Sequence, residues 1–156
     1  RVICPDMAGR GRSAPFANPA FYNNAQYLND CLTLLQHLRA DRVDWVGTSM
    51  GGLIGMLLAA QPHHPIRRLV INDIGAFVPA AALVDIKTYV GDNPAFATWD
   101  AYYAAFKQRM APFGLETEAQ RHDLAKTSLA LTDEGHFRLA YDPNIIFGLQ
   151  NSAEIA

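Results

Sequence analysis

Cysteine, long apolar runs and an excess of one charge are all scarce in this 156-residue sequence. Its two cysteines, Cys4 and Cys31, lack the C-x-x-C spacing of metal and redox sites, so we expect two buried free thiols and no bound metal. The longest mainly apolar stretch, residues 53–60, is far shorter than the roughly 20 residues that a membrane-spanning helix needs. No charged and then apolar leader opens the chain, so the sequence favours a cytoplasmic protein that does not bind a membrane.

Basic residues are too few and too scattered for a nucleic-acid-binding protein. The chain has 13 Lys and Arg against 15 Asp and Glu, which gives a net charge of −2. A small molecule is therefore the expected partner, and nucleic acid is not. Of the residues, 50% are hydrophobic and 18% are charged, which is typical of a globular protein.

Short apolar runs alternate with helical patterns in the first half of the chain. The predicted elements are a helix over residues 24–39, a strand over 43–46, a helix over 53–61 and a strand over 68–73. Asn23 or Asn24 is the expected cap of the first helix, because a side-chain amide oxygen can accept a backbone N–H there. This alternation predicts an α/β protein with a parallel sheet.

The opening residues 2–4 also predict a short buried strand. Such a strand needs neighbours on both sides to pair its N–H and C=O groups. We therefore expect earlier strands to be missing and the sequence to be a piece of a longer protein.

Helices dominate the second half of the chain. They are predicted near residues 80–90, 98–110 and 116–129, and residues 129–131 and 137–141 are expected to form either a hairpin or an extended crossing. The aromatic residues Trp99, Tyr102, Tyr103 and Phe106 recur at spacings of three and four. We interpret them first as a packing stripe and only second as a pocket wall.

A G-x-S-x-G motif, Gly47-Thr48-Ser49-Met50-Gly51, lies between a predicted strand and a predicted helix. In that context the motif indicates a sharp turn that holds the serine in a strained conformation and exposes its hydroxyl. Gly47 and Gly51 are expected to flank the serine because side chains there would collide as strand and helix approach each other.

Such a turn can provide part of a nucleophilic catalyst. The Ser49 hydroxyl would attack a carbonyl carbon, and a histidine would have to take its proton. The Met50 N–H lies at the start of a helix, at the positive end of its dipole, so it can act as an oxyanion donor. The alternative is a turn serine on a scaffold without activity.

A second motif accompanies the first. Residues 6–13 match D-x-x-G-x-G-x-S, and together with the Ser49 turn they resemble the α/β-hydrolase fold superfamily. The resemblance implies a mostly parallel sheet with flanking helices, part of whose core would be residues 1–78, and a helical cap over residues 79–156. It also makes Ser49 the nucleophile.

The resemblance places the triad histidine beyond residue 156, so we interpret all five histidines here as structural. Asp73 ends a predicted strand at a position that some family members use for the triad acid, although a turn carboxylate is the favoured interpretation. Asp6 is expected to brace its loop by accepting hydrogen bonds from nearby N–H groups.

These observations predict a serine hydrolase, carboxylesterase-like, that acts on a small ester, thioester or lactone without a cofactor. Carbon–carbon bond hydrolysis and perhydrolase activity stay open, because they use the same turn. A non-catalytic ligand-binding member of the family is the alternative from another class. The 156 residues alone are expected to be inactive, and the sequence does not indicate an oligomeric state.

Overall fold

The computed structural model describes residues 1–151 and divides into two compact units. The elbow unit comprises Phe16–Thr88 and the segment that begins at Ile146, and the helical unit comprises Arg1–Pro15 and Tyr89–Ile145. The division into a core of residues 1–78 and a cap of residues 79–156 stays a prediction.

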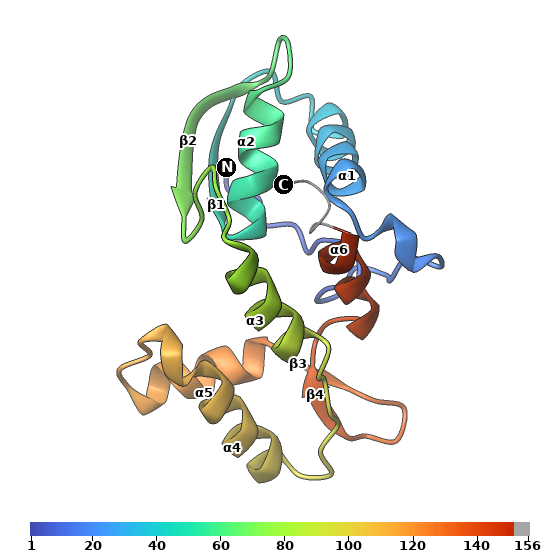
Figure 1. The fold of residues 1–156 in the computed structure, drawn as a ribbon, viewed down its shortest axis with the longest axis vertical. Helices are drawn as coiled ribbons and strands as arrows, with labels where there is room; N and C mark the ends of the chain where they lie inside the picture. Colours follow the sequence, from blue (N-terminus) through green and yellow to red (C-terminus); the bar gives the residue numbers. More distant parts are fainter. Residues whose placement is uncertain (152–156) are drawn as a thin grey trace. The chain divides into compact units, whose positions relative to one another are not determined.

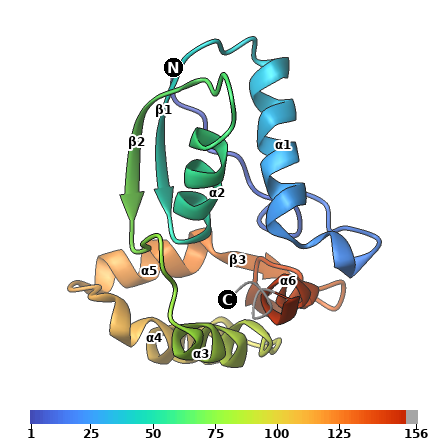
Figure 2. The same ribbon diagram turned by 45° about the horizontal axis from the view of Figure 1, so that its top comes forward.

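A two-stranded parallel sheet forms the centre of the elbow unit. β1 (Val43–Thr48) pairs with β2 (Ile66–Asn72), with Trp45 opposite Leu69 and Thr48 opposite Asn72. α2 (Met50–Ala59) packs on both strands (Figures 1 and 2). The predicted strands and their parallel arrangement are confirmed.

Helix α1 (Asn24–His37) packs against α2 and begins where the sequence predicts. The Asn23 side chain accepts a hydrogen bond from the Gln26 N–H at 2.9 Å, which caps the first turn. Tyr27 and Cys31, one turn apart, are the buried residues of this helix.

Three further short helices belong wholly or mostly to the elbow unit. α3 (Ala80–Val90) has the predicted bounds. The 3-10 helix η1 (Pro19–Phe21) and the α-helix α6 (Ile146–Asn151) contact each other, and the sequence did not predict either of them.

The helical unit packs around aromatic side chains. Its elements are α4 (Trp99–Met110), η2 (Ala111–Phe113), α5 (Glu118–Thr127), the antiparallel strands β3 (Leu129–Leu131) and β4 (Phe137–Leu139), and η3 (Pro143–Ile145). Tyr102, Phe106 and Ala125 form its buried cluster, and the Tyr102 hydroxyl donates to the Ala125 carbonyl at 3.0 Å. Trp99 and Tyr103 pack against this cluster, so the packing interpretation of the aromatic stripe is confirmed.

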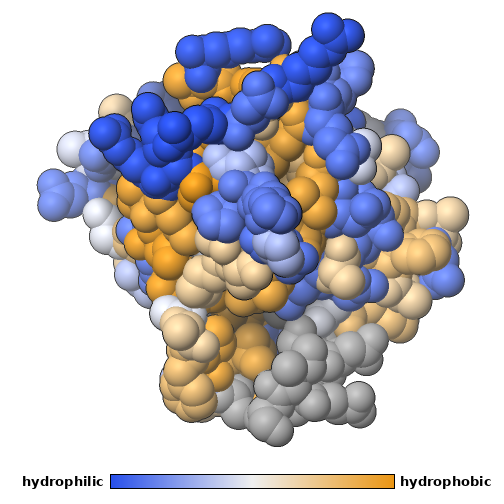
Figure 3. Space-filling view, turned by 90° about the horizontal axis from the view of Figure 1, so that it is seen from above, coloured by the Kyte–Doolittle hydropathy of each residue, from blue (hydrophilic) through white to orange (hydrophobic). Residues whose placement is uncertain are grey.

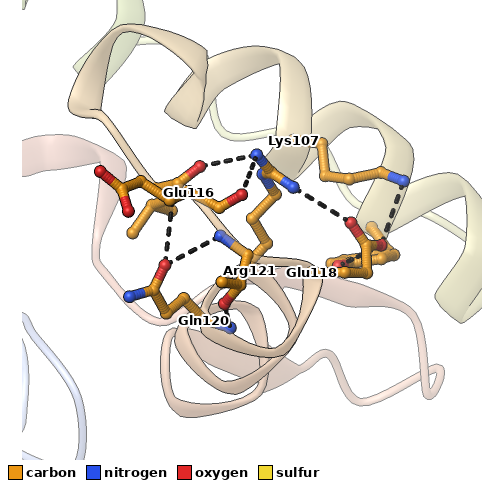
Figure 4. A network of polar contacts seen from close by, with 8 residues as sticks. Lys107, Glu116, Glu118, Gln120 and Arg121 are labelled. Atoms are coloured by element: carbon orange, nitrogen blue, oxygen red, sulfur yellow. Dashed lines mark hydrogen bonds and ion pairs between the residues drawn. The ribbon is translucent and has the colours of Figure 1, made fainter.

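Polar contacts also join α4 to α5 (Figure 4). The Glu118 carboxylate accepts a hydrogen bond from the Tyr103 hydroxyl at 2.8 Å and lies 3.5 Å from Lys107 and 3.4 Å from Arg121. The Tyr103 hydrogen bond, followed by the nearby cations, lowers the pKa of Glu118. At neutral pH the carboxylate is therefore an ionised link between the two helices.

The loop that contains the second motif is held by its own side chains. The Asp6 carboxylate accepts the Arg12 N–H at 3.0 Å, which confirms the predicted bracing role. Gly11 has a φ of +55°, and an added Cβ would lie 2.4 Å from the Asp6 carboxyl carbon. Within the helical unit this loop also bonds the chain after β4, through Gly11 N–H to Ala140 C=O at 2.8 Å.

Two sequence predictions near the N-terminus are wrong. Residues 2–4 form no strand, and Val2 is 88% exposed. A strand exists only where a neighbouring strand accepts its hydrogen bonds, and no described residue pairs with this segment. Cys4 is consequently exposed rather than buried, whereas Cys31 is buried as predicted.

Apolar surface is exposed elsewhere as well. Val46 and Val70, which pair across β1 and β2, are 74% and 53% exposed. The space-filling view shows apolar residues (orange) at the surface among hydrophilic ones (blue) (Figure 3). None of the described helices combines the length and the apolar character that crossing a membrane requires.

The two cysteines should differ in reactivity. Burial, and secondarily the charge of Asp30, raises the pKa of Cys31 to about 11, so about one thiol in a thousand is ionised at pH 8. Iodoacetamide at pH 8 should alkylate Cys4 and leave Cys31 almost unmodified, as measured by peptide mass mapping. Both should react in denaturing guanidinium chloride. Equal alkylation of both cysteines in the folded protein would contradict the burial of Cys31.

Candidate active site

Ser49 is the single residue between β1, which ends at Thr48, and α2, which begins at Met50. The strand and the helix are drawn in Figure 1. Its backbone has φ 50° and ψ −116°, a conformation that costs a residue with a side chain about 1–3 kcal/mol. The residue is exposed, and its hydroxyl makes no hydrogen bond to cap α2. The predicted strained, exposed serine is therefore present in the structure.

Backbone hydrogen bonds hold this turn on both sides. The Ser49 N–H donates to the Asn72 carbonyl of β2 at 2.9 Å. The Ser49 carbonyl accepts from the N–H groups of Gly52 and Leu53 at 2.9 and 3.1 Å. One peptide group of the serine is thus fixed to the sheet and the other to the helix, which offsets the cost of its conformation.

The two glycines of the motif have different surroundings. A Cβ at Gly47 would lie 2.2 Å from the Gly51 carbonyl oxygen, so only glycine fits there. A Cβ at Gly51 would meet no atom of the described residues within 4 Å. The expected collision therefore occurs at Gly47, whereas the described part of the chain provides none at Gly51.

The position of Met50 suits an oxyanion donor. It is the first residue of α2, so its N–H lies in the first turn, at the positive end of the helix dipole. Because Met50 follows Ser49 directly, an oxygen bound to a carbon that Ser49 attacks can lie near this end of the helix.

Asp73 follows the β2 residue that binds Ser49. Thr48 and Asn72 are paired across the sheet, and the Asn72 side chain donates to the Thr48 hydroxyl at 3.3 Å. Ser49 and Asp73 therefore come directly after paired residues at the carboxyl edge of the two strands. Asp73 has a φ of 56°, which Asp and Asn tolerate better than other residues with side chains.

The histidines of the elbow unit do not pair with Ser49 in the described residues. Within the elbow unit, no hydrogen bond joins Ser49 to His37, His63 or His64. In the helical unit, His122 packs edge-on against the rings of Trp99 and Tyr103. Among residues 1–151, no group of three or more His, Cys, Asp or Glu side chains could hold a metal ion.

The helical unit contains a pocket of about 340 Å³. Tyr102, Phe106 and Leu139 contribute to its apolar wall, and Arg109 gives it a polar group. The Arg109 guanidinium donates to the Tyr141 hydroxyl at 3.2 Å and lies 3.9 Å from the Asp92 carboxylate. Burial raises the pKa of Tyr102 to about 12, so its hydroxyl stays protonated at neutral pH.

Comparison with known proteins agrees with this geometry. Residues 1–145 match the family model described as "alpha/beta hydrolase fold". The chain belongs to this family. The predicted fold class and family resemblance are confirmed.

Two named relatives resemble the chain over different lengths. A 3-hydroxybutyrate-oligomer hydrolase from Cupriavidus necator is 40% identical over 155 residues, which are 97% of this chain and 53% of that protein. A 2-hydroxymuconate semialdehyde hydrolase from a Pseudomonas species is 37% identical over 98 residues, which are 62% of this chain and 34% of that protein. Both relatives are hydrolases.

A solved α/β-hydrolase structure from Novosphingobium aromaticivorans superimposes with a TM-score of 0.83 at 35% identity, over 91% of this chain and 50% of that one. The chain thus spans about half the length of this structure and of the Cupriavidus hydrolase.

The sequence pattern missed two residues around the turn. Asn72 holds the Ser49 N–H, and the Trp45 indole N–H donates to the Gly51 carbonyl at 2.9 Å. Both contacts depend on how β1, β2 and α2 pack together. The bulky Trp45 four residues before the serine, with Gly55 in the following helix, was the available signal for the second contact.

Replacing the two motif glycines should separate their roles. Gly47→Ala places a methyl group against backbone atoms that cannot move aside, so we expect a loss of about 1–3 kcal/mol in unfolding free energy. Gly51→Ala meets open space in an α-helix and should change stability by less than about 1 kcal/mol. Denaturant unfolding measures both, and equal effects would contradict the close approach at Gly47.

A separate substitution tests the role of Asp73. Asn accepts the same backbone conformation, so Asp73→Asn in the full-length protein should leave any hydrolase kcat/KM within about threefold of that of the unaltered protein if the carboxylate only shapes the turn. A loss of about 10⁴-fold, the scale on which neutralising a triad acid acts, would instead identify Asp73 as that acid.

Proposed function

We propose that the protein is a serine hydrolase that cleaves a small carboxylic ester, with Ser49 as the nucleophile. The observation that carries this proposal is the Ser49 backbone, held at φ 50° between a strand and a helix with its hydroxyl not used for capping. A turn with only a structural role would gain nothing from a strained serine, because glycine adopts positive φ without that cost.

The proposed reaction proceeds through an acyl-enzyme. The Ser49 Oγ attacks the ester carbonyl carbon while a histidine base takes its proton, and the Met50 N–H helps to bind the resulting oxyanion. When the tetrahedral intermediate collapses, the bond to the alcohol oxygen breaks and the histidine returns the proton to that oxygen. Water then attacks the acyl-enzyme in the same way, releasing the acid and restoring Ser49.

The other parts of this mechanism are proposed to lie outside residues 1–156. They are the histidine base and the second oxyanion donor, and we expect the 156 residues alone to be inactive without them. Proton transfer and oxyanion binding by protein groups are sufficient for this reaction, so we propose no metal ion or organic cofactor. We propose a small-molecule substrate as the partner and the cytoplasm as the location of the protein.

The Cupriavidus relative suggests the first substrate to test. Its name gives oligomers of 3-hydroxybutyrate as its substrate, and the units of such oligomers are joined by ester bonds. The identity of 40% extends over 97% of this chain. We therefore propose short hydroxyacyl esters of this kind, ahead of thioesters and lactones.

A carbon–carbon bond hydrolase is the second candidate. The Pseudomonas relative acts on 2-hydroxymuconate semialdehyde, a compound without an ester, and matches 62% of this chain. The shorter match ranks this candidate below the ester hydrolase. A non-catalytic binding protein with the same fold is the third candidate.

A fluorophosphonate probe tests the proposed nucleophile. In the full-length protein we expect one phosphonate adduct on Ser49, with hydrolysis of the linear 3-hydroxybutyrate dimer. Ser49→Ala should abolish labelling and lower kcat by at least about 10³-fold, because no other group supplies the attacking oxygen. Intact and peptide mass spectrometry locate the adduct, and product acid measures turnover.

The matched control is Thr48→Val, which removes the neighbouring hydroxyl and should leave labelling in place. Labelling without dimer hydrolysis, together with cleavage of the semialdehyde, would favour the second candidate. Absence of both labelling and turnover in the full-length protein would overturn the enzyme proposal and favour the binding protein.

A further inference from the structure

We propose that the indole N–H of Trp45 is a positioning group for the nucleophile turn, acting through the Gly51 carbonyl. This inference rests on the proposed function, since it concerns the same turn. Trp45 lies in β1, four residues before Ser49, and its Nε1–H donates to the Gly51 carbonyl oxygen at 2.9 Å. The bond thus connects the strand that precedes the serine to the helical turn that follows it.

The acceptor is a carbonyl in the first turn of α2. In a regular α-helix the Gly51 carbonyl accepts the N–H of residue 55, and its second lone pair can accept the indole as well. The same oxygen faces Gly47, where an added Cβ would lie only 2.2 Å away. Two residues of β1 therefore restrict the Gly51 carbonyl group: Trp45 through a hydrogen bond and Gly47 through a close contact.

Gly55 makes room for the indole. A Cβ at this position would lie 2.7 Å from the Trp45 Nε1 and 2.8 Å from its Cδ1. Glycine in a helix interior costs about 1 kcal/mol relative to alanine, so its presence here needs a compensating packing or functional reason. The close approach of the Trp45 ring to the helix provides that reason.

Three hydrogen-bonded contacts, with Asn72, Gly52 and Trp45, each hold a different peptide group of the turn. Hydrogen bonds to Asn72 and from Gly52 fix the two peptide groups of Ser49. The Met50 N–H belongs to the same peptide group as the Ser49 carbonyl, which the Gly52 N–H holds. The Gly52 N–H belongs in turn to the same peptide group as the Gly51 carbonyl, which the Trp45 indole holds. Trp45 therefore acts on the direction of the proposed oxyanion donor through these two peptide groups, without touching the substrate itself.

This role predicts a specific kinetic effect. Misplacing an oxyanion donor weakens binding of the transition state more than binding of the substrate. Loss of the indole N–H should therefore lower kcat and the rate of phosphonate labelling while KM changes little. A side chain that only fills space would lower the melting temperature without this division between kcat and KM.

The experiment compares three forms of the full-length protein. Trp45→Phe removes the donor and keeps an aromatic ring, and replacement of Trp45 by benzothienylalanine exchanges the N–H for a sulfur atom at nearly constant shape. Trp99→Phe is the control, because Trp99 packs in the helical unit against Tyr103 and His122. Each form is assayed for the labelling rate of Ser49, for kcat and KM, and for amide hydrogen exchange in residues 50–53.

Both Trp45 changes should slow labelling and lower kcat about 10-fold, the effect expected from one hydrogen bond, with KM within about twofold. Amide hydrogen exchange in residues 50–53 should become faster in both Trp45 forms. The Trp99 control should leave the labelling rate, kcat, KM and this exchange unchanged. An unchanged labelling rate in the benzothienylalanine form would overturn the proposal, even if Trp45→Phe unfolds. Unchanged hydrogen exchange in that form would also overturn it.

The exchange measurement separates this inference from the proposed function. If Ser49 of the unaltered protein is not labelled at all, the proposed hydrolase function fails. Faster exchange on loss of the indole N–H would then confirm the Trp45 contact but overturn its role in catalysis. If the unaltered protein is labelled and the Trp45 forms match it, only the Trp45 proposal fails.

Discussion

The close approach of α2 to β1 is the constraint on which the candidate site depends. At Gly47 the strand lies so near the helix that a Cβ would lie 2.2 Å from a helix carbonyl oxygen. A chain that turns from strand to helix within so little space cannot use the extended conformation that normally precedes a helix. The positive φ of Ser49 follows from this geometry, and it leaves the serine at the carboxyl edge of the sheet.

Hydrogen bonds from three parts of the chain stabilise this arrangement. β2 supplies the Asn72 carbonyl, α2 supplies the Gly52 and Leu53 N–H groups, and β1 supplies the Trp45 indole. Each bond contributes about 0.5–1.5 kcal/mol, so together they are of the size needed to offset a strain of about 1–3 kcal/mol. The strained turn is therefore a property of the packed unit and not of the pentapeptide alone.

The distinction between local patterns and packing also explains which features the sequence could predict. The start of α1, the bounds of α3 and the parallel pair β1 and β2 follow from periodicity and turn residues within each segment. The antiparallel pair β3 and β4 is one of the two arrangements that the sequence left open. The roles of Ser49 and Gly47 in the turn could be predicted because the motif that contains them is local in the sequence. The segment of residues 2–4 and the exposure of Cys4 were predicted wrongly, because a strand depends on pairing partners distant in the sequence. The bonds of Trp45 and Asn72 were missed for the same reason.

A comparison of helix starts shows what is unusual about Ser49. The residues that cap α1, α4 and α5 are Asn23, Thr98 and Thr117, with φ of −141°, −129° and −106°, and each uses its side-chain oxygen to accept a backbone N–H. Ser49 is as good a capping residue by type, yet its φ of 50° turns the side chain away and no capping bond forms. The helix thus lacks the stabilisation of about 1 kcal/mol that a side-chain cap provides, and the Ser49 hydroxyl stays exposed at its start. That combination stabilises neither the helix nor the sheet, and it is what the proposed nucleophilic attack by Ser49 would require.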